Sequence, residues 1–201
     1  MNSQTKMSER GEPTRAAESR ALADMASDEE RLPELARLSV ETFVREERVL
    51  ETPRVSDDSL LNQGAACFVS IKTYEGDLRG CIGTVEPIRP TLAEELIHNA
   101  ISAATRDPRF FPVQSSELPR LRYSVDVLSP PEATRFEELN PKIYGLIVED
   151  AQEGRRGLLL PDLEGVETAA QQLQITARKA GIVPGADVKL YRFQVRRYGE
   201  K

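Results

Sequence analysis

A cysteine and an arginine stand two positions apart in the segment Leu78-Arg79-Gly80-Cys81-Ile82-Gly83. If this segment is a β-strand, side-chain alternation sends Arg79 and Cys81 to the same face. A guanidinium beside a thiol favours the nucleophilic thiolate form. Cys81 is therefore a candidate catalytic nucleophile, and the alternative is a free cysteine that only fills space in the core.

The same segment has features of an anion-binding site. Arg79 has the donor geometry to hold a carboxylate or a phosphate by two parallel hydrogen bonds. Gly80 and Gly83 are expected to leave space for a ligand or another backbone, because glycine otherwise weakens a strand. The alternative for Arg79 is an ion pair with an internal acid such as Asp107 or Asp126.

Three further residues are candidates for this site. Asp107 and Arg109 follow a predicted helix, so they either contribute to the rim of a ligand pocket or form a salt bridge at the helix end. Asp107 and Tyr144 are the candidate proton carriers for a reaction at the thiol. His98 falls in the polar half of the same helix, where exposure to solvent explains it without proton transfer.

Metal and cofactor sites are not predicted. The chain has two cysteines and one histidine, which cannot supply the four Cys or His ligands of a structural zinc site. The sequence contains no P-loop, G-x-G-x-x-G or G-x-S-x-G motif. The acidic residues of the C-terminal half lack the spacing of a calcium loop and are expected to form a solvated surface: Glu149, Asp150, Glu153, Asp162 and Glu164.

Composition argues against nucleic-acid and membrane binding. The net charge is −6 and the pI is near 5.1, whereas nucleic-acid binders present a basic face to phosphates. No apolar run approaches the ~20 residues of a transmembrane helix. The first 26 residues lack the order of a secretory signal. We therefore expect a cytoplasmic protein with reduced thiols.

An N-terminal helix is predicted after Ser27, which has the spacing of a capping box with Glu30. Apolar residues then recur at helical spacing as far as Val44. Pro33 is tolerated only in the first turn of a helix, so we expect the helix to start at Leu32.

A β-hairpin and a second helix follow. Strands are predicted over residues 65–73 and 78–84, with a glycine-containing turn between them. Thr91 begins a helix that must end before Pro108. On a helical wheel the apolar residues of this helix fill one half, and the other half is polar: Glu94, Glu95, His98, Asn99, Ser102, Thr105 and Arg106.

The C-terminal half of the chain reads as strands around one more helix. Gly181 is the expected C-cap of that helix. The predicted elements are a strand over 123–127, a hairpin of strands 146–148 and 158–160, a helix over 167–180 and a last strand over 190–197.

The strands and helices do not alternate as a βαβ series, which predicts an α+β fold with an antiparallel or mixed sheet covered by helices. Residues 27–201 are expected to form one compact, bilobed domain. Residues 1–26 show no periodic apolar face and are expected to form a flexible N-terminal extension.

Five ordered motifs resemble those of the AMMECR domain family: LRGCIG at 78–83, DPRF at 107–110, LSPPE at 128–132, GLLLP at 157–161 and KAG at 179–181. The resemblance covers roughly residues 28–185. It implies an α+β domain with a larger and a smaller lobe, and a cleft that carries the hexapeptide LRGCIG. It implies no known reaction.

The resemblance also implies partners. Prokaryotic members of the family are similar to component A of a three-part system with a Memo-like dioxygenase-fold protein and a radical SAM protein. The chain departs from the family pattern at Tyr144, Ala177 and Asp162, where many relatives have other residues. It also lacks a second Cys or His at those positions to act beside Cys81, which argues against a catalytic dyad.

Three functional hypotheses follow. The leading one is a domain whose Arg79-Gly80-Cys81 cleft binds a small ligand or a partner segment, as an accessory component of a modification pathway. The second is a thiol-dependent enzyme in which Cys81 attacks an electrophile and Arg79 holds an anionic group. The third is a protein interaction module without catalysis, in which the hexapeptide is a packing device.

Overall fold

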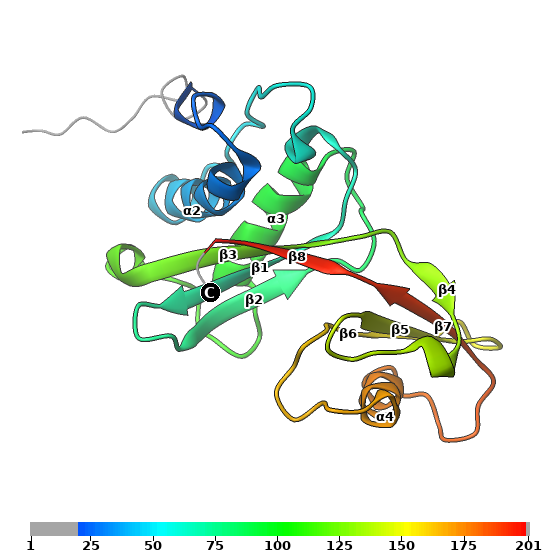
Figure 1. Ribbon diagram of the computed structural model, residues 1–201. Helices are drawn as coiled ribbons and strands as arrows, with labels where there is room; N and C mark the ends of the chain where they lie inside the picture. Colours follow the sequence, from blue (N-terminus) through cyan, green and yellow to red (C-terminus); the bar gives the residue numbers. More distant parts are fainter. Residues whose placement is uncertain (1–19, 200–201) are drawn as a thin grey trace, which may run out of the picture.

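The computed structural model describes residues 20–199, which form a larger and a smaller lobe (Figure 1). Each lobe is built on a four-stranded sheet in which neighbouring strands are antiparallel. The predicted α+β class is therefore confirmed, with two sheets where the sequence suggested one.

The larger sheet has the strand order β2-β1-β3-β8. Its first two strands are the predicted hairpin, and its last strand comes from the C-terminus of the chain. The strands are β1 (Cys67–Thr73), β2 (Leu78–Gly83), β3 (Leu121–Leu128) and β8 (Val195–Gly199). Single-turn 3-10 helices at Leu60–Asn62 and Leu118–Arg120 lie in the connections.

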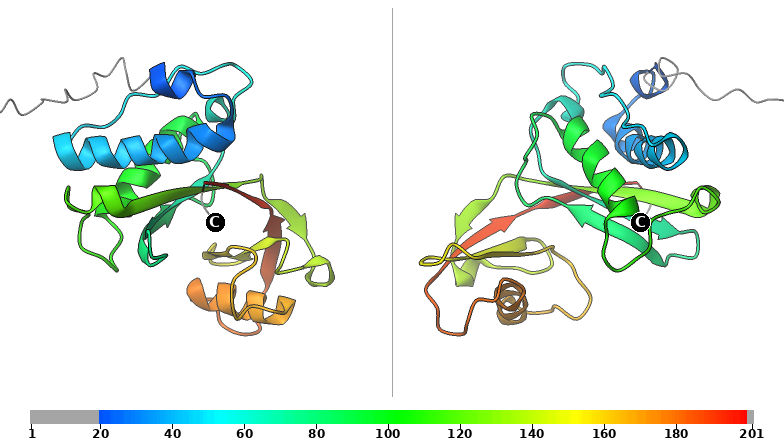
Figure 2. Two further views of the ribbon diagram at one scale, coloured as in Figure 1. Left: turned by 60° about the vertical axis from the view of Figure 1, so that its left-hand side comes forward. Right: turned by 180° about the vertical axis from the view of Figure 1, so that it is seen from behind.

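Helices α2 (Asp28–Glu46) and α3 (Leu92–Thr105) cover one face of the larger sheet (Figures 1 and 2). Inward-facing strand residues such as Val69 and Val125 are fully buried against helix residues such as Leu35. Each such side chain contributes about 1.5–3 kcal/mol by its burial. Within residues 20–199, no helix covers the other face of this sheet.

Helix α2 begins at Asp28, earlier than the predicted start at Leu32. Pro33 lies inside the helix, where its missing N–H removes one backbone hydrogen bond. The first turn is held instead by the Asp28 carboxylate, which accepts hydrogen bonds from Ser59 Oγ at 2.7 Å and from the Leu60 N–H at 2.8 Å. Ser27 is the N-cap residue, but its side chain makes no capping bond.

Helix α3 begins after Thr91 as predicted, and the Thr91 side chain accepts a hydrogen bond from the Glu94 N–H. The predicted polar half is not all at the surface, because Glu95 and Asn99 are buried. Glu95 accepts hydrogen bonds from Thr84 Oγ1 at 2.6 Å and from two backbone N–H groups of the loop that follows β2. Asn99 donates to the carbonyl of Cys67 at 3.0 Å. These two side chains attach the hairpin to the helix.

The smaller sheet has the order β4-β7-β5-β6 and packs one face on helix α4 (Ala169–Lys179). Thr168 and Gln171 form a capping box at the start of this helix. The strands are β4 (Glu132–Thr134), β5 (Gly145–Asp150), β6 (Arg156–Leu159) and β7 (Val188–Phe193), with a 3-10 helix at Phe136–Glu138 after β4.

The predicted last strand over 190–197 is two strands in two different sheets. Strand β7 ends at Phe193 and β8 begins at Val195. At the switch between them, Gln194 and Ser129 exchange hydrogen bonds of 2.9 Å. A buried cluster joins the lobes at this point: Ala66, Leu128, Ile147, Leu158 and Phe193.

The packed part of the chain begins before residue 27. Residues 20–23 form a helical turn, and Leu22 is buried in the core of the larger lobe. The expected flexible extension over 1–26 is therefore wrong for residues 20–26, and residues 1–19 lie outside the described part of the chain. Between residues 20 and 199, no helix is long and apolar enough to cross a membrane.

Candidate functional site

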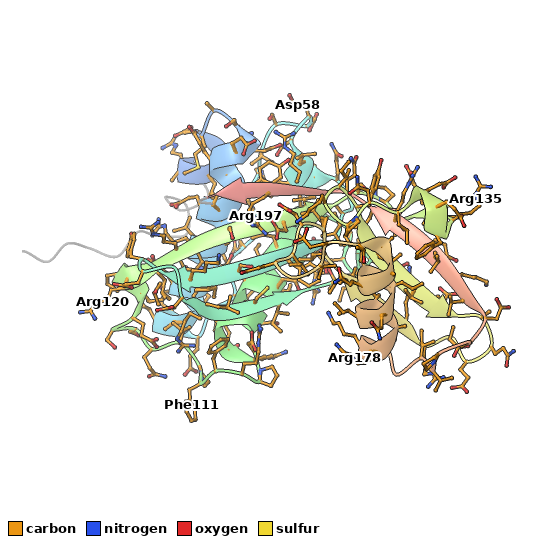
Figure 3. The ribbon with its side chains drawn as sticks, turned by 60° about the horizontal axis from the view of Figure 1, so that its bottom comes forward. Asp58, Phe111, Arg120, Arg135, Arg178 and Arg197 are labelled. Atoms are coloured by element: carbon orange, nitrogen blue, oxygen red, sulfur yellow. The ribbon has the colours of Figure 1, made fainter. Side chains whose placement is uncertain are left out.

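The open face of the larger sheet carries a row of polar side chains. In the strand register, Ser70 pairs with Cys81 on one side and with Ser124 on the other. Asp126 pairs with Arg197 in the neighbouring strands. Alternation sends these residues to the face away from α2 and α3. Figure 3 looks at the molecule from this side, with Arg197 over β8 and β3.

Arg79 does not lie free beside the thiol. Leu78 and Gly80 pair with successive residues of β1, so Arg79 is the extra residue of a β-bulge and has no register partner. Its guanidinium donates to both carboxylate oxygens of Glu117, at 2.7 and 3.0 Å, and to the carbonyl of Phe111 at 2.9 Å. These hydrogen bonds hold the pKa of Glu117 below its ordinary value. Arg79 therefore forms an ion pair with an internal acid, which was the alternative to ligand binding. Its partner is Glu117 and not Asp107 or Asp126.

The two glycines of the hexapeptide allow close packing rather than ligand space. A Cβ atom on Gly80 would lie 2.1 Å from the carbonyl oxygen of Ala103 in α3. A Cβ atom on Gly83 would lie 2.3 Å from the ring of Phe68. Glycine is required at both positions because helix α3 and an aromatic ring occupy the space that a side chain would need.

Cys81 is half-buried and held through its backbone. Its N–H donates to Asp107 Oδ2 at 2.9 Å, and its carbonyl oxygen accepts from Arg109 Nη2 at 3.4 Å. Its sulfur accepts a hydrogen bond from Ser70 Oγ at 3.3 Å. The structure thus brings Cys81 together with Asp107 and Arg109, the two candidate residues that follow helix α3.

Asp107 and Arg109 form a bidentate ion pair. Arg109 Nε and Nη2 donate to the two Asp107 oxygens at 2.9 and 2.7 Å. The Asp107 side chain is 2% exposed, whereas that of Arg109 is 55% exposed. The hydrogen bonds from Arg109, together with the Cys81 N–H, hold the pKa of Asp107 far below its ordinary range. Asp107 is therefore ionised at neutral pH and cannot act there as the proton carrier that the sequence suggested.

Arg197 and Asp126 form a second pair of the same kind. Both hydrogen bonds are 2.7 Å, the Asp126 side chain is 4% exposed and that of Arg197 is 51% exposed. The pKa of Arg197 is raised chiefly by Asp126 and to a smaller degree by Cys81 and by Asp162 of the smaller lobe. Cys81 makes a similar small contribution to the raised pKa of Arg109, whose main cause is Asp107. Both guanidinium groups therefore lie within electrostatic range of the thiol.

Arg197 was not among the residues proposed from the sequence, and no local motif pairs it with Asp126. The polar positions of strand β3 were a usable signal, because Asp126 had to face away from the core. The pairing itself depends on β8 returning to the sheet beside β3 from the far end of the chain.

Tyr144 is not brought to this site. It lies before β5 in the smaller lobe, where its ring is 4.8 Å from the guanidinium of Arg192 and its carbonyl accepts from Gln172. His98 lies on α3, which covers the opposite face of the larger sheet. Burial and the nearby Arg89 lower the pKa of His98. Among residues 20–199, no three His, Cys, Asp or Glu side chains cluster as metal ligands would.

The AMMECR1 family model matches residues 33–198. The chain belongs to the AMMECR1 family. A relative from Thermotoga maritima is 49% identical over 161 residues, which are 79% of this chain and 91% of that protein. A relative from Clostridium acetobutylicum is 44% identical over 83% of this chain, but the match spans only 35% of that longer protein.

A crystal structure of an uncharacterized protein from Pyrococcus horikoshii has the same fold as this AMMECR1 domain. The two structures superpose with a TM-score of 0.74 at 33% sequence identity. The superposition covers 86% of this chain and 92% of the Pyrococcus chain. The fold described above is therefore shared with the Pyrococcus protein.

Proposed function

We propose that this AMMECR1 domain binds an anionic group of a small ligand or partner segment on the open face of its larger sheet, beside Cys81. The observation that carries the proposal is the pair of half-exposed guanidinium groups, Arg109 and Arg197. Each is held by a buried carboxylate, Asp107 or Asp126. The role is binding rather than catalysis.

The geometry of the two ion pairs supports this role. A guanidinium has five N–H donors in a rigid plane, and a carboxylate bound to Nε and one terminal nitrogen engages only one edge. The other terminal nitrogen of Arg109 and of Arg197 makes no hydrogen bond to any residue in the described part of the chain. Both groups are therefore fixed in place with donors left over for a carboxylate or phosphate oxygen.

A thiol enzyme is the second candidate, because Cys81 is only half-buried and its sulfur accepts a hydrogen bond from Ser70 Oγ at 3.3 Å. A reaction at a thiol also needs a group that can take up or supply a proton. Asp107 is held ionised, and Tyr144 lies in the other lobe. The site as built therefore supports anion binding better than nucleophilic catalysis.

The binding proposal is tested by titrating the ¹⁵N-labelled domain with sodium phosphate at constant ionic strength. We expect saturable shifts of the amide signals of Ser70 and Cys81. Arg109→Lys and Arg197→Lys should each weaken binding about tenfold, because lysine keeps the charge but loses the planar fork. Arg120→Lys is the matched control, since Arg120 is exposed and lies at the end of the sheet away from Arg197 (Figure 3).

Two outcomes separate the candidates. Linear, unsaturated shifts, or equal affinity in all three lysine variants, would contradict the binding proposal. Cys81→Ser should leave phosphate affinity within about twofold, because the guanidinium groups and not the sulfur hold the anion. Retention of binding in Cys81→Ser also distinguishes anion binding from a role that depends on the thiol.

We further propose that the domain acts as an accessory component beside a Memo-like dioxygenase-fold protein and a radical SAM protein. The support is the family resemblance, together with the Clostridium relative in which this module is only 35% of a longer chain. Co-expression of all three proteins from one genome should give co-elution in size-exclusion chromatography. Separate elution of this chain from both would contradict the proposal and favour a different interaction partner.

A further inference from the structure

Helix α4 buries polar side chains against the smaller sheet, while its apolar residues stay partly exposed to solvent. Gln172 and Thr176 are fully buried against the sheet. The Gln172 amide donates to the Tyr144 carbonyl at 2.8 Å, and Thr176 Oγ1 donates to the Gln172 carbonyl at 2.6 Å. Leu173 and Ala177, one position further along, are only partly buried. Apolar residues spaced like this normally face a core.

The position of α4 on the smaller sheet explains why these apolar residues are only partly buried. A Cβ atom on Gly157 of β6 would lie 2.5 Å from the Thr176 carbonyl oxygen and 3.0 Å from the Ala180 Cβ. The helix is therefore pressed against the β6 edge of the smaller sheet. The helix also covers β5, whose Leu146 and Val148 are fully buried beneath it, but among the described residues it does not extend across β7 on the same face.

A cavity of about 810 Å³ lies beside α4, over β7 and under the segment that follows the helix. Its floor is apolar and comes from α4, β5, β7 and the segment after α4: Val148, Leu173, Ala177, Ile182, Ala186 and Val188. At its edge, Phe136 is 42% exposed and Val183 is 61% exposed. Binding sites for small organic molecules typically measure ~300–1,000 Å³ and are mainly apolar.

One charged side chain lines this cavity. Arg178 lies on the same helical stripe as Gln174, is exposed, and makes no ion pair or side-chain hydrogen bond within residues 20–199. Other arginines of the smaller lobe are paired, such as Arg155 with Asp150 at 3.0 Å. The cavity therefore combines a long apolar floor with a single uncompensated positive charge at its rim.

We propose that this cavity binds an amphiphile with one alkyl chain and an anionic head group, of the fatty-acid class. The alkyl chain lies on the partly exposed Leu173, Ala177 and Val188, and the carboxylate pairs with Arg178. This site is separate from the open face at Cys81. The cavity lies on the α4 side of the smaller sheet, whereas the other side of that sheet packs toward the larger lobe (Figure 1).

The test is calorimetric titration of the full chain with dodecanoate and with dodecanol, both below the concentration at which they aggregate. We expect dodecanoate to bind with a stoichiometry of one. Arg178→Gln should weaken dodecanoate about tenfold and leave dodecanol unchanged, because only the acid has a charge to pair. Arg106→Gln is the matched control: an exposed arginine at the end of α3, in the other lobe.

Two further variants examine the cavity itself. Ala177→Phe should fill it and abolish binding of both compounds. Val183→Glu should place a negative charge at the exposed rim and weaken dodecanoate far more than dodecanol. Circular dichroism establishes that each variant is folded, and the exposed position of Val183 keeps the test valid if Ala177→Phe does not fold.

The absence of saturable dodecanoate binding to the wild type would overturn the proposal. Equal affinities in Arg178→Gln, Val183→Glu and the wild type would do the same. If sedimentation shows that the wild type is a dimer and Val183→Glu is a monomer, and dodecanoate does not bind, the cavity face belongs to a second copy of the chain. Phosphate binding at Cys81 is measured separately, so each proposal can fail alone.

Discussion

At the scale of single residues, the arginine that contacts Cys81 is Arg109, which follows helix α3. Arg79 of the hexapeptide does not have this role. Arg79 is engaged by Glu117 and Phe111. Arg109 is held by Asp107, which also accepts the Cys81 N–H. The position of Cys81 is therefore linked to the charge of one buried carboxylate.

Asp107→Asn tests this link through pH. The folded-state pKa of Asp107 lies below its ordinary value of 3.8, so its stabilising effect is fully present above that value. The effect is lost as the pH falls through the lower, folded-state pKa. We expect Asp107→Asn to cost about 1.5–3 kcal/mol at pH 7. The difference in melting temperature from wild type should narrow below pH 4.

The control is Asp77→Asn, because Asp77 is exposed in the turn between β1 and β2. It should lower the melting temperature little at any pH. If the difference in melting temperature between wild type and Asp107→Asn stays constant from pH 7 to pH 2, the carboxylate charge does not stabilise the fold.

Asp107 and Arg109 could be predicted from the sequence because they follow a helix with a clear end. The position of Arg79 could not be predicted, because strand alternation fails where a bulge inserts an extra residue, and no residue type marks that bulge. The place of Arg197 in the site could not be predicted either, because its partner Asp126 is 71 positions away in the chain. Long-range pairs of this kind are fixed by sheet topology and not by local pattern.

At the scale of elements, local patterns predicted the β1–β2 hairpin, strand β3 and the start of helix α3. They could not show that Glu95 and Asn99 face the loop after β2, because a helical wheel separates polar from apolar side chains but does not locate neighbouring loops. The same limit applies at Gln194, where one continuous strand pattern crosses from one sheet to the other.

Gly80→Ala tests the contact between β2 and α3. The added Cβ would lie 2.1 Å from a backbone oxygen of α3, so either the helix or the strand must move. We expect a loss of about 1–3 kcal/mol in the free energy of unfolding. Gly64→Ala is the control, because its Cβ would meet the nearest atom at an ordinary 3.4 Å. Equal urea midpoints for the two variants would refute the close contact.

At the scale of the whole molecule, the two lobes share one buried cluster and two chain crossings. Phe193 is central to this junction: it is buried, and a Cβ atom on Gly145 would lie 2.1 Å from its ring. Arg156 of β6 adds an ion pair to Glu86 of the larger lobe at 2.6 Å. The lobes should therefore unfold together.

Phe193→Ala should lower the free energy of unfolding by about 3–5 kcal/mol, because it leaves a cavity at the junction. The wild type should lose the amide signals of Val69 and Val148, one from each lobe, at the same urea concentration. Loss of the Val148 signal well before that of Val69 would mean that the smaller lobe is an independent folding unit.

The central claim is that Arg109 and Arg197 attract an anion to Cys81. It is tested most directly by the ratio of alkylation rates at Cys81 for iodoacetate, which is charged, and iodoacetamide, which is neutral. Cys67 serves as the internal reference, because its burial raises the pKa of its thiol to about 12 and should keep it unreactive in the folded protein.

We predict that this ratio is about tenfold higher in the folded protein than in urea. Arg109→Gln and Arg197→Gln should each return it toward the unfolded value. A folded-state ratio equal to or below the unfolded one would contradict anion binding at this face.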